Sequence, residues 1–137
     1  MKRIFTLSAL AVITTLLFGS CVKNGVFYDD ESYWLSREQG QVVYSSPTCN
    51  YYVVETNYGY SILRSNTSYK PYERDIVYGD FGYKGTRDIY NWTARYVFSA
   101  TITDSRLSYT QAQLALDYYC PYGKGERPFL KADALKK

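Results

Sequence analysis

The sequence predicts a mainly β domain, a small antiparallel barrel or sandwich with one α-helix in its C-terminal half. Three observations support this fold class: several short β-branched and aromatic runs between turn residues, one long run with two-residue periodicity, and one late segment with helix-capping residues. Tyrosine, which fits the pleated surface of a strand, occurs 17 times in the 137 residues. We therefore expect a domain that uses tyrosine rings where others use leucine or isoleucine.

The clearest strand lies at residues 95–103. Tyr96, Phe98, Ala100 and Ile102 alternate along it with more polar neighbours. Such alternation is what a strand with one buried face and one solvent face requires.

Five further runs predict strands earlier in the chain. They lie at residues 41–44, 51–56, 60–64, 75–81 and 85–91. The Asn-Tyr-Gly segment 57–59 joins the second run to the third and predicts a hairpin. The polar segment 65–72 predicts a loop. Residues 22–40 begin as a tether, and the remainder of this segment is compatible with a short strand or with a helical turn.

A single helix is predicted at about residues 109–120. Ser108 and Gln111 have the spacing of a capping box, and Pro121 ends the segment. We expect the helix to pack against the sheet and to fill one end of a partly open barrel. A β-sandwich with a terminal helix is the alternative. The order of elements is weakly similar to that of OB-like barrels.

The N-terminus has the features of a secretory signal. Two basic residues precede an uncharged run at residues 4–18, which is shorter than the roughly 20 residues that span a bilayer. Gly19, Ser20 and Cys21 follow, and here the segment resembles the signal peptide of bacterial lipoproteins. Phe18 stands where such signals usually have leucine.

The resemblance implies that Cys21 carries the lipid and that the membrane is a partner through this anchor, palmitate being a typical acyl group. An ordinary cleaved signal is the alternative. Val22 is not the aspartate that retains lipoproteins at the inner membrane, so we expect the outer membrane, or otherwise a periplasmic or secreted protein. The expected organisation is signal peptide 1–20, lipidated tether 21–40, β-rich domain 41–122 and C-terminal tail 123–137.

The two remaining cysteines, Cys49 and Cys120, are a disulfide candidate in an oxidising compartment. The alternative is two buried free thiols. The chain has no histidine, and two distant cysteines do not have the spacing of a zinc site. We therefore expect neither a metal nor a cofactor.

The charge of the chain argues against nucleic acid as a partner. The formal net charge is +3, but Lys2 and Arg3 leave with the signal peptide, so 14 basic side chains face 13 acidic ones in the mature chain. Nucleic-acid binding calls for a basic patch or stripe. We expect no nucleic acid partner.

The residue types also restrict catalysis. Without histidine, a Ser-His-Asp or Cys-His arrangement is excluded. A pair of carboxylates can hydrolyse glycosides, and the acids near predicted strands are Glu55, Asp75, Asp80 and Asp88. Because surface acids are common in any domain, we expect the protein not to be an enzyme.

Binding is the remaining class of function. Residues 85–92 hold an arginine, an aspartate, a tyrosine and a tryptophan, a density typical of a recognition loop but also of a strand with an Asp–Arg pair. The candidate binding residues are Tyr83, Arg87, Tyr90 and Trp92, and a wider aromatic face would add Trp34, Tyr58 and Tyr60. We expect a cell-envelope lipoprotein with a non-catalytic structural or protein-interaction domain. The alternative is a glycan- or peptidoglycan-binding module that uses exposed tyrosine and tryptophan.

Overall fold

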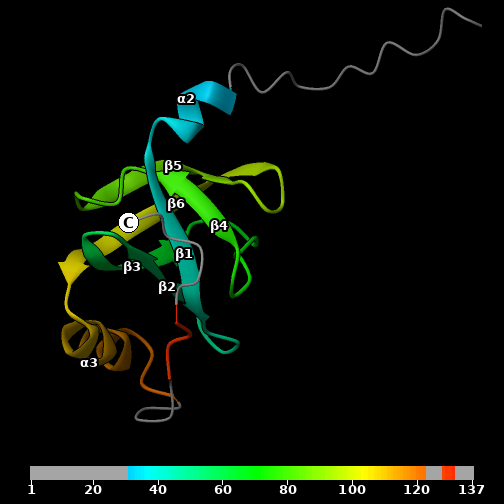
Figure 1. Ribbon diagram of the computed structural model, residues 1–137. Coiled ribbons are helices and arrows are strands. Elements are labelled where there is room, and N and C mark those ends of the chain that lie inside the picture. Colours follow the sequence, from blue (N-terminus) through cyan, green and yellow to red (C-terminus); the bar gives the residue numbers. More distant parts are fainter. Residues whose placement is uncertain (1–30, 123–127, 132–137) are drawn as a thin grey trace, which may run out of the picture.

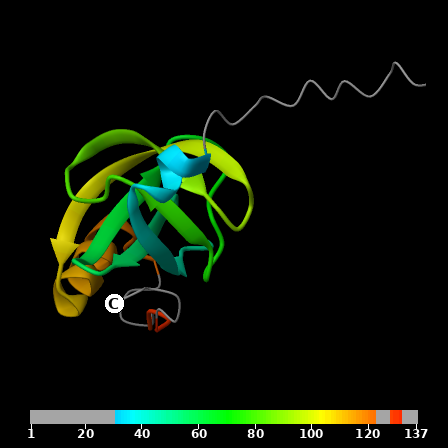
Figure 2. The same cartoon turned by 45° about the horizontal axis from the view of Figure 1, so that its top comes forward.

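The computed structural model describes residues 31–122 and 128–131. Six antiparallel strands form a closed barrel in the order β1-β2-β3-β6-β5-β4, with β4 returning to β1 (Figures 1 and 2). The predicted fold class is confirmed, as a barrel and not a sandwich. The elements are α2 (Glu31–Leu35), β1 (Glu38–Ser45), β2 (Tyr51–Thr56), β3 (Gly59–Ser65), β4 (Ile76–Gly79), β5 (Gly85–Asn91), β6 (Tyr96–Leu107) and α3 (Tyr109–Tyr119).

The barrel consists of two three-stranded meanders. β1, β2 and β3 form the first and β4, β5 and β6 the second, and the β1–β4 and β3–β6 pairs close the wall. The predicted hairpin is present, because Thr56 pairs with Gly59 across a two-residue turn. Gly59 has a φ of +115°, which favours glycine. OB folds have five strands, so the likeness extends only to a small antiparallel barrel.

The barrel interior is the main hydrophobic core. Phe98, Ala100 and Ile102 point into it from β6, as the alternation predicts, whereas Tyr96 at the end of the strand is 44% exposed. The interior is filled by ten buried side chains, Val42, Tyr52, Val54, Leu63, Val77, Phe81, Ile89, Phe98, Ala100 and Ile102.

The helix α3 covers the outside of the barrel wall and does not fill an end of it. Val53 and Ile62 are paired across β2 and β3 and point outward, because their neighbours along each strand point inward. They pack against Ala112 and Leu116 of α3. The interior is already occupied by large aromatic side chains, so the outer face of β1–β3 is the apolar surface left for the helix to cover.

The start of α3 has the predicted capping box. The Ser108 hydroxyl accepts a hydrogen bond from the backbone N–H of Gln111, and the Gln111 side chain accepts one from the backbone N–H of Ser108. We expect Ser108→Ala to lower the free energy of unfolding by about 1 kcal/mol, measured by urea denaturation. Thr110→Ala, an exposed control in the same turn, is expected to stay within about 0.5 kcal/mol of wild type. Equal losses in both variants would contradict the capping role.

The end of α3 is held to β6 by a tyrosine–aspartate hydrogen bond. The Tyr119 hydroxyl donates to Asp104 at 2.8 Å. This bond, together with burial, raises the pKa of Tyr119 to about 12 from its ordinary value of 10.0. The folded state therefore resists ionisation of the phenol, which the unfolded chain allows at lower pH.

We expect this contribution to stability to be complete below pH about 10 and to be lost as the pH rises to about 12. The measurement is urea denaturation across that range. Tyr119→Phe should be less stable at neutral pH and show a smaller alkaline loss. Tyr118→Phe, whose side chain is 81% exposed, is the matched control and should keep the wild-type profile. An unchanged alkaline loss in Tyr119→Phe would contradict the assignment.

The predicted cysteine pair is confirmed at disulfide distance. Cys49 lies in the loop between β1 and β2, Cys120 caps the C-terminus of α3, and their Cα atoms are 6.1 Å apart. The pair fastens the end of α3 to the barrel. The Lys70 ammonium donates to the backbone carbonyls of Ser46 and Cys49 and so holds the same loop from the other side.

Residues 31–35, which the sequence leaves open between strand and helix, form α2. This short helix lies at the opposite end of the molecule from α3 and contacts β4 (Figure 1). Glu31 pairs with Arg95, and the Trp34 ring packs on Tyr90 with 5.8 Å between ring centroids. The expected signal peptide with Cys21 lies outside the described residues.

Candidate functional site

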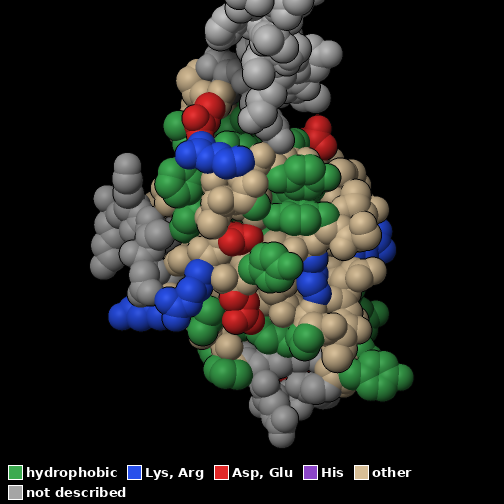
Figure 3. All heavy atoms as spheres, turned by 90° about the vertical axis from the view of Figure 1, so that its right-hand side faces the viewer, with side chains coloured by type: hydrophobic (Ala, Val, Ile, Leu, Met, Phe, Trp, Pro, Cys, Tyr) green, Lys and Arg blue, Asp and Glu red, His purple; other side chains and the backbone are tan. Residues whose placement is uncertain are grey.

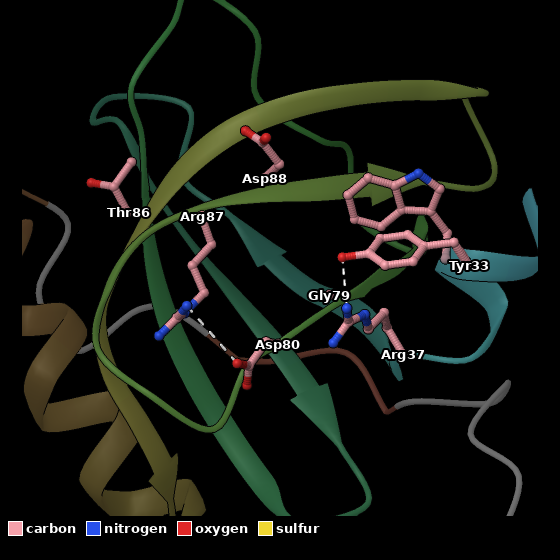
Figure 4. Close-up of a pocket in the computed structure, with 8 residues that line it drawn as sticks. Tyr33, Arg37, Gly79, Asp80, Thr86, Arg87 and Asp88 are labelled. Carbon is pink, nitrogen blue, oxygen red and sulfur yellow. Dashed lines mark hydrogen bonds and ion pairs between the residues drawn. The ribbon is translucent and has the colours of Figure 1, made fainter. Parts of the chain in front are cut away.

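A pocket opens in the barrel wall beside α2. Its cavity volume is about 470 Å³, within the range of roughly 300–1,000 Å³ typical of ligand sites. α2 and the turn after it form one side, the end of β4 a second, and the first half of β5 a third (Figure 4). We call this cavity the α2–β5 pocket. Its lining residues are Tyr33, Trp34, Arg37, Gly79, Asp80, Thr86, Arg87 and Asp88.

The pocket exists because β4 separates from β5. β5 pairs with β6 along all seven of its residues, from Gly85 to Asn91. It pairs with β4 only at Tyr90 and Asn91. After Asp80 the loop 80–84 runs away from β5, and it rejoins that strand only just before Thr86 (Figure 4). The wall is thus one strand short over the first half of β5.

The loop 80–84 is fastened elsewhere in the barrel. The Phe81 side chain is 1% exposed and lies in the inner core. The Phe81 carbonyl accepts a hydrogen bond from the Ser61 hydroxyl of β3 at 3.2 Å, and the Gly82 carbonyl accepts one from the Ser105 hydroxyl of β6 at 3.1 Å. These bonds direct the loop backbone to β3 and β6 and away from β5.

The aromatic side of the pocket comes from α2. Tyr33 is 48% exposed, and the Arg37 guanidinium lies 4.4 Å from the centre of its ring. Arg37 also donates to the Tyr33 hydroxyl at 2.6 Å, as Figure 4 shows. Trp34 meets Tyr33 edge to face at 5.2 Å. A ring and a guanidinium held together in this way provide an apolar surface and planar hydrogen-bond donors side by side.

The opposite side of the pocket carries charges of both signs. Arg87 and Asp80 form a long ion pair, 3.9 Å between Nη1 and Oδ2. The Nε atom of Arg87 is buried without a hydrogen-bond partner. Thr86 and Asp88 are exposed, and the Thr86 hydroxyl bonds to that of Thr101 at 2.9 Å. Two arginines thus face two aspartates around the cavity, so its lining has no net charge.

The structure separates the four candidate binding residues of the sequence. Arg87 lies in the α2–β5 pocket, whereas Tyr90 is 3% exposed behind Trp34. Trp92 is 39% exposed and packs under Arg95, 5.0 Å from its ring centre, and Tyr83 is 66% exposed on the loop 80–84. Trp34 of the wider aromatic face lines the pocket with Arg87, whereas Tyr58 and Tyr60 do not. Tyr33 and Arg37, which the sequence did not indicate, complete its aromatic side. Tyr33 and Arg37 are four residues apart, the spacing of neighbours on a helix, although Arg37 lies two residues beyond the end of α2.

Of the four candidate acids, two line the pocket and two lie elsewhere. Asp80 and Asp88 line the pocket. Asp75 is 8% exposed and accepts hydrogen bonds from the Asn91 side chain at 2.6 Å and from the backbone N–H of Tyr72 at 3.0 Å. It has a structural role at the start of β4. Burial, together with the interaction with Glu55, raises the pKa of Tyr60 on β3 to about 12.

A second hollow of about 610 Å³ lies beside the β1–β2 loop. Lys70 lines it, and burial lowers the pKa of its ammonium. Because this ammonium is bound to the carbonyls of Ser46 and Cys49, its role is to hold the loop that carries the disulfide. We therefore regard the α2–β5 pocket as the better candidate site.

The face shown in Figure 3 carries several small groups of hydrophobic side chains separated by polar and charged ones. Among residues 31–122 and 128–131, no three His, Cys, Asp or Glu side chains are placed to share a metal ion. No helix in this part of the chain is long and apolar enough to cross a bilayer.

Fold and site together define a small closed antiparallel β-barrel with a charge-balanced, partly aromatic pocket at a break in its wall. Comparisons with models of protein families, with curated proteins and with solved structures give no significant match for this chain.

Proposed function

We propose that the protein is a lipid-anchored domain of the bacterial cell envelope. The support is the lipoprotein-like leader ending in Cys21. Several acyl chains on that residue would hold the domain at a membrane, because one chain alone anchors only marginally. With Val22 after the cysteine, the proposed location is the outer membrane.

We expect Cys21→Ser to abolish acylation and release the protein from the membrane fraction. The substitution removes the thiol to which the acyl chain would be attached. The measurement is radioactive palmitate labelling of cells, followed by membrane fractionation. Ser20→Ala keeps the thiol and serves as the matched control, which should remain labelled. Continued labelling of Cys21→Ser would overturn the proposal.

We further propose that the barrel is a non-catalytic interaction domain that binds another envelope protein at the α2–β5 pocket. The observation that carries this is the pocket itself, where an exposed ring and two guanidinium groups face two carboxylates. Arginine and tyrosine are enriched among the residues that dominate protein interfaces.

The test is cross-linked capture of partners from envelope extract by the full chain in detergent. Tyr33→Ala should reduce capture, because it removes the exposed ring on which Arg37 packs. Tyr58→Ala is the matched control: Tyr58 is 64% exposed and lies under Arg106 at 5.3 Å, outside the pocket. Equal capture by wild type and Tyr33→Ala would remove the pocket from the proposal.

A glycan- or peptidoglycan-binding module is the second candidate. It is favoured by the half-exposed Tyr33 ring beside arginine donors and aspartate acceptors, which suits a ligand with both an apolar face and hydroxyl groups. Sedimentation of the protein with purified peptidoglycan and with envelope polysaccharides tests it. Binding that Tyr33→Ala abolishes and Tyr58→Ala preserves would favour this candidate over a protein partner.

A further inference from the structure

We propose that the α2–β5 pocket receives an extended peptide segment of the partner protein, which adds to the first half of β5 as an extra strand. This inference rests on the proposed protein-interaction function and names the form of the partner. It follows from two features of β5: the side to which its backbone N–H and C=O groups point, and the lack of a paired strand beside its first half.

A hydrogen bond at the C-terminal end of β5 shows which side the backbone N–H and C=O groups of this strand face. The Trp92 backbone N–H donates to the Ile76 carbonyl at 2.9 Å, so it points toward β4. Successive residues of a strand turn their N–H and C=O groups to opposite sides. The backbone groups of Tyr90, Asp88 and Thr86 therefore point to the β4 side, whereas those of Arg87 and Ile89 point to β6.

Only the first of these three positions has a partner in β4. Tyr90 pairs with Tyr78, and the same register would place Asp80 opposite Asp88. β4 ends at Gly79, and the chain that follows it turns away from β5. Among the described residues, no strand therefore pairs with Asp88 or Thr86 on the β4 side. Both residues line the pocket. Their backbone donors and acceptors thus face a cavity and not a neighbouring strand.

An extended peptide fits this gap better than a charged ligand does. Adjacent strands lie about 4.8 Å apart, so a strand in the pocket would bond directly to Thr86 and Asp88. Its alternating side chains would meet Tyr33 and Arg37 on one face and Arg87 on the other. Because the lining has two arginines and two aspartates, backbone pairing and not net charge would supply the attraction.

The location of the gap also favours a specific partner. A free strand edge invites unselective pairing, and closed barrels avoid it by having no edge. Here the free edge is confined to a few residues and is flanked by α2 and by the loop 80–84. Only a short extended segment that passes between these two elements would reach it.

Amide hydrogen exchange on the full chain tests the first step. In the free protein, the amides of Thr86 and Asp88 should exchange much faster than those of Arg87 and Ile89, which face β6. Equal protection of all four amides would overturn the inference, because the edge would then already be paired.

The second step uses random linear peptides displayed on phage and selected on the immobilised full chain. The best synthetic peptide should slow exchange at Thr86 and Asp88 by about tenfold. Asp88→Pro removes the N–H that points into the gap and should weaken peptide binding by about tenfold. Asp88→Ala removes the same carboxylate but keeps the N–H, so it should bind several-fold more tightly than Asp88→Pro, and the difference between the two variants measures the backbone bond. A far-ultraviolet spectrum and thermal melt confirm that both variants fold.

In this second step, the inference would be overturned by the absence of an enriched peptide, by protection at other amides only, or by equal loss of binding in both Asp88 variants. Peptidoglycan binding that blocks exchange at the same amides, without peptide enrichment, would assign the gap to a sugar and also overturn it. Protein capture that is sensitive to Tyr33→Ala but not to Asp88→Pro would leave the proposed function standing without strand addition. Protein capture that neither Tyr33→Ala nor Asp88→Pro reduces would remove both the proposed function and strand addition.

Discussion

Removal of the Cys49–Cys120 disulfide is expected to lower the free energy of unfolding by about 4 kcal/mol. The two cysteines are 71 residues apart in the chain, so the bond restricts a long loop of the unfolded state. In the folded state it fastens the end of α3 to the β1–β2 loop, where Cys120 is 1% exposed. Urea denaturation of the Cys49→Ala/Cys120→Ala double variant measures the loss.

The comparison needs a background without the third thiol, so both proteins carry Cys21→Ser. Adding reductant to the parent should reproduce the loss seen in the double variant, and reductant should leave the double variant unchanged. A loss below about 1 kcal/mol from either treatment would contradict the prediction, because a cross-link over this loop length stabilises by more.

Phe81→Ala is expected to lower the free energy of unfolding by about 3–5 kcal/mol. Phe81 belongs to a loop, yet its ring is buried in the barrel core beside Ile89, and its removal leaves a cavity there. The measurement is urea denaturation. Tyr83→Ala is the matched control, since Tyr83 is 66% exposed on the same loop and its loss should change stability by no more than about 0.5 kcal/mol.

The same substitution is expected to disturb the α2–β5 pocket. Without its ring in the core, the loop 80–84 keeps only the hydrogen bonds of its carbonyls to Ser61 and Ser105. Faster amide exchange in this loop, with β2 and β3 still protected, is the expected pattern. If Phe81→Ala and Tyr83→Ala were equally stable, the loop would not be anchored by its ring.

Local sequence features predicted the elements well. The runs 51–56 and 85–91 coincide with β2 and β5, and the capping box places the start of α3 at Tyr109. Each of these signals acts between residues close in the chain, through the alternation of a strand or the first turn of a helix. The weaker signal was the short stretch 31–35, because a five-residue helix is stabilised by tertiary packing and not by its own propensity.

The candidate site was harder to predict from the sequence than the strands and the helix. Arg87 was selected from a segment dense in charged and aromatic residues, and it does line the pocket. Tyr33 and Arg37 approach it across some fifty residues of chain, through the pairing of β1 with β4. Tyr90 and Trp92 looked similar to Arg87 in sequence, but α2 covers the former and Arg95 packs on the latter.

The amino-acid sequence alone determined that this protein is a β domain with one late helix and that its two distant cysteines can pair. Closure of the sheet into a barrel, the outer position of α3 and the pocket beside α2 were decided only by the tertiary structure. The physical reason is that they depend on which strands meet. β1 pairs with β4, β3 pairs with β6, and Ser61 and Ser105 draw the loop 80–84 away from β5, so that the wall is left one strand short.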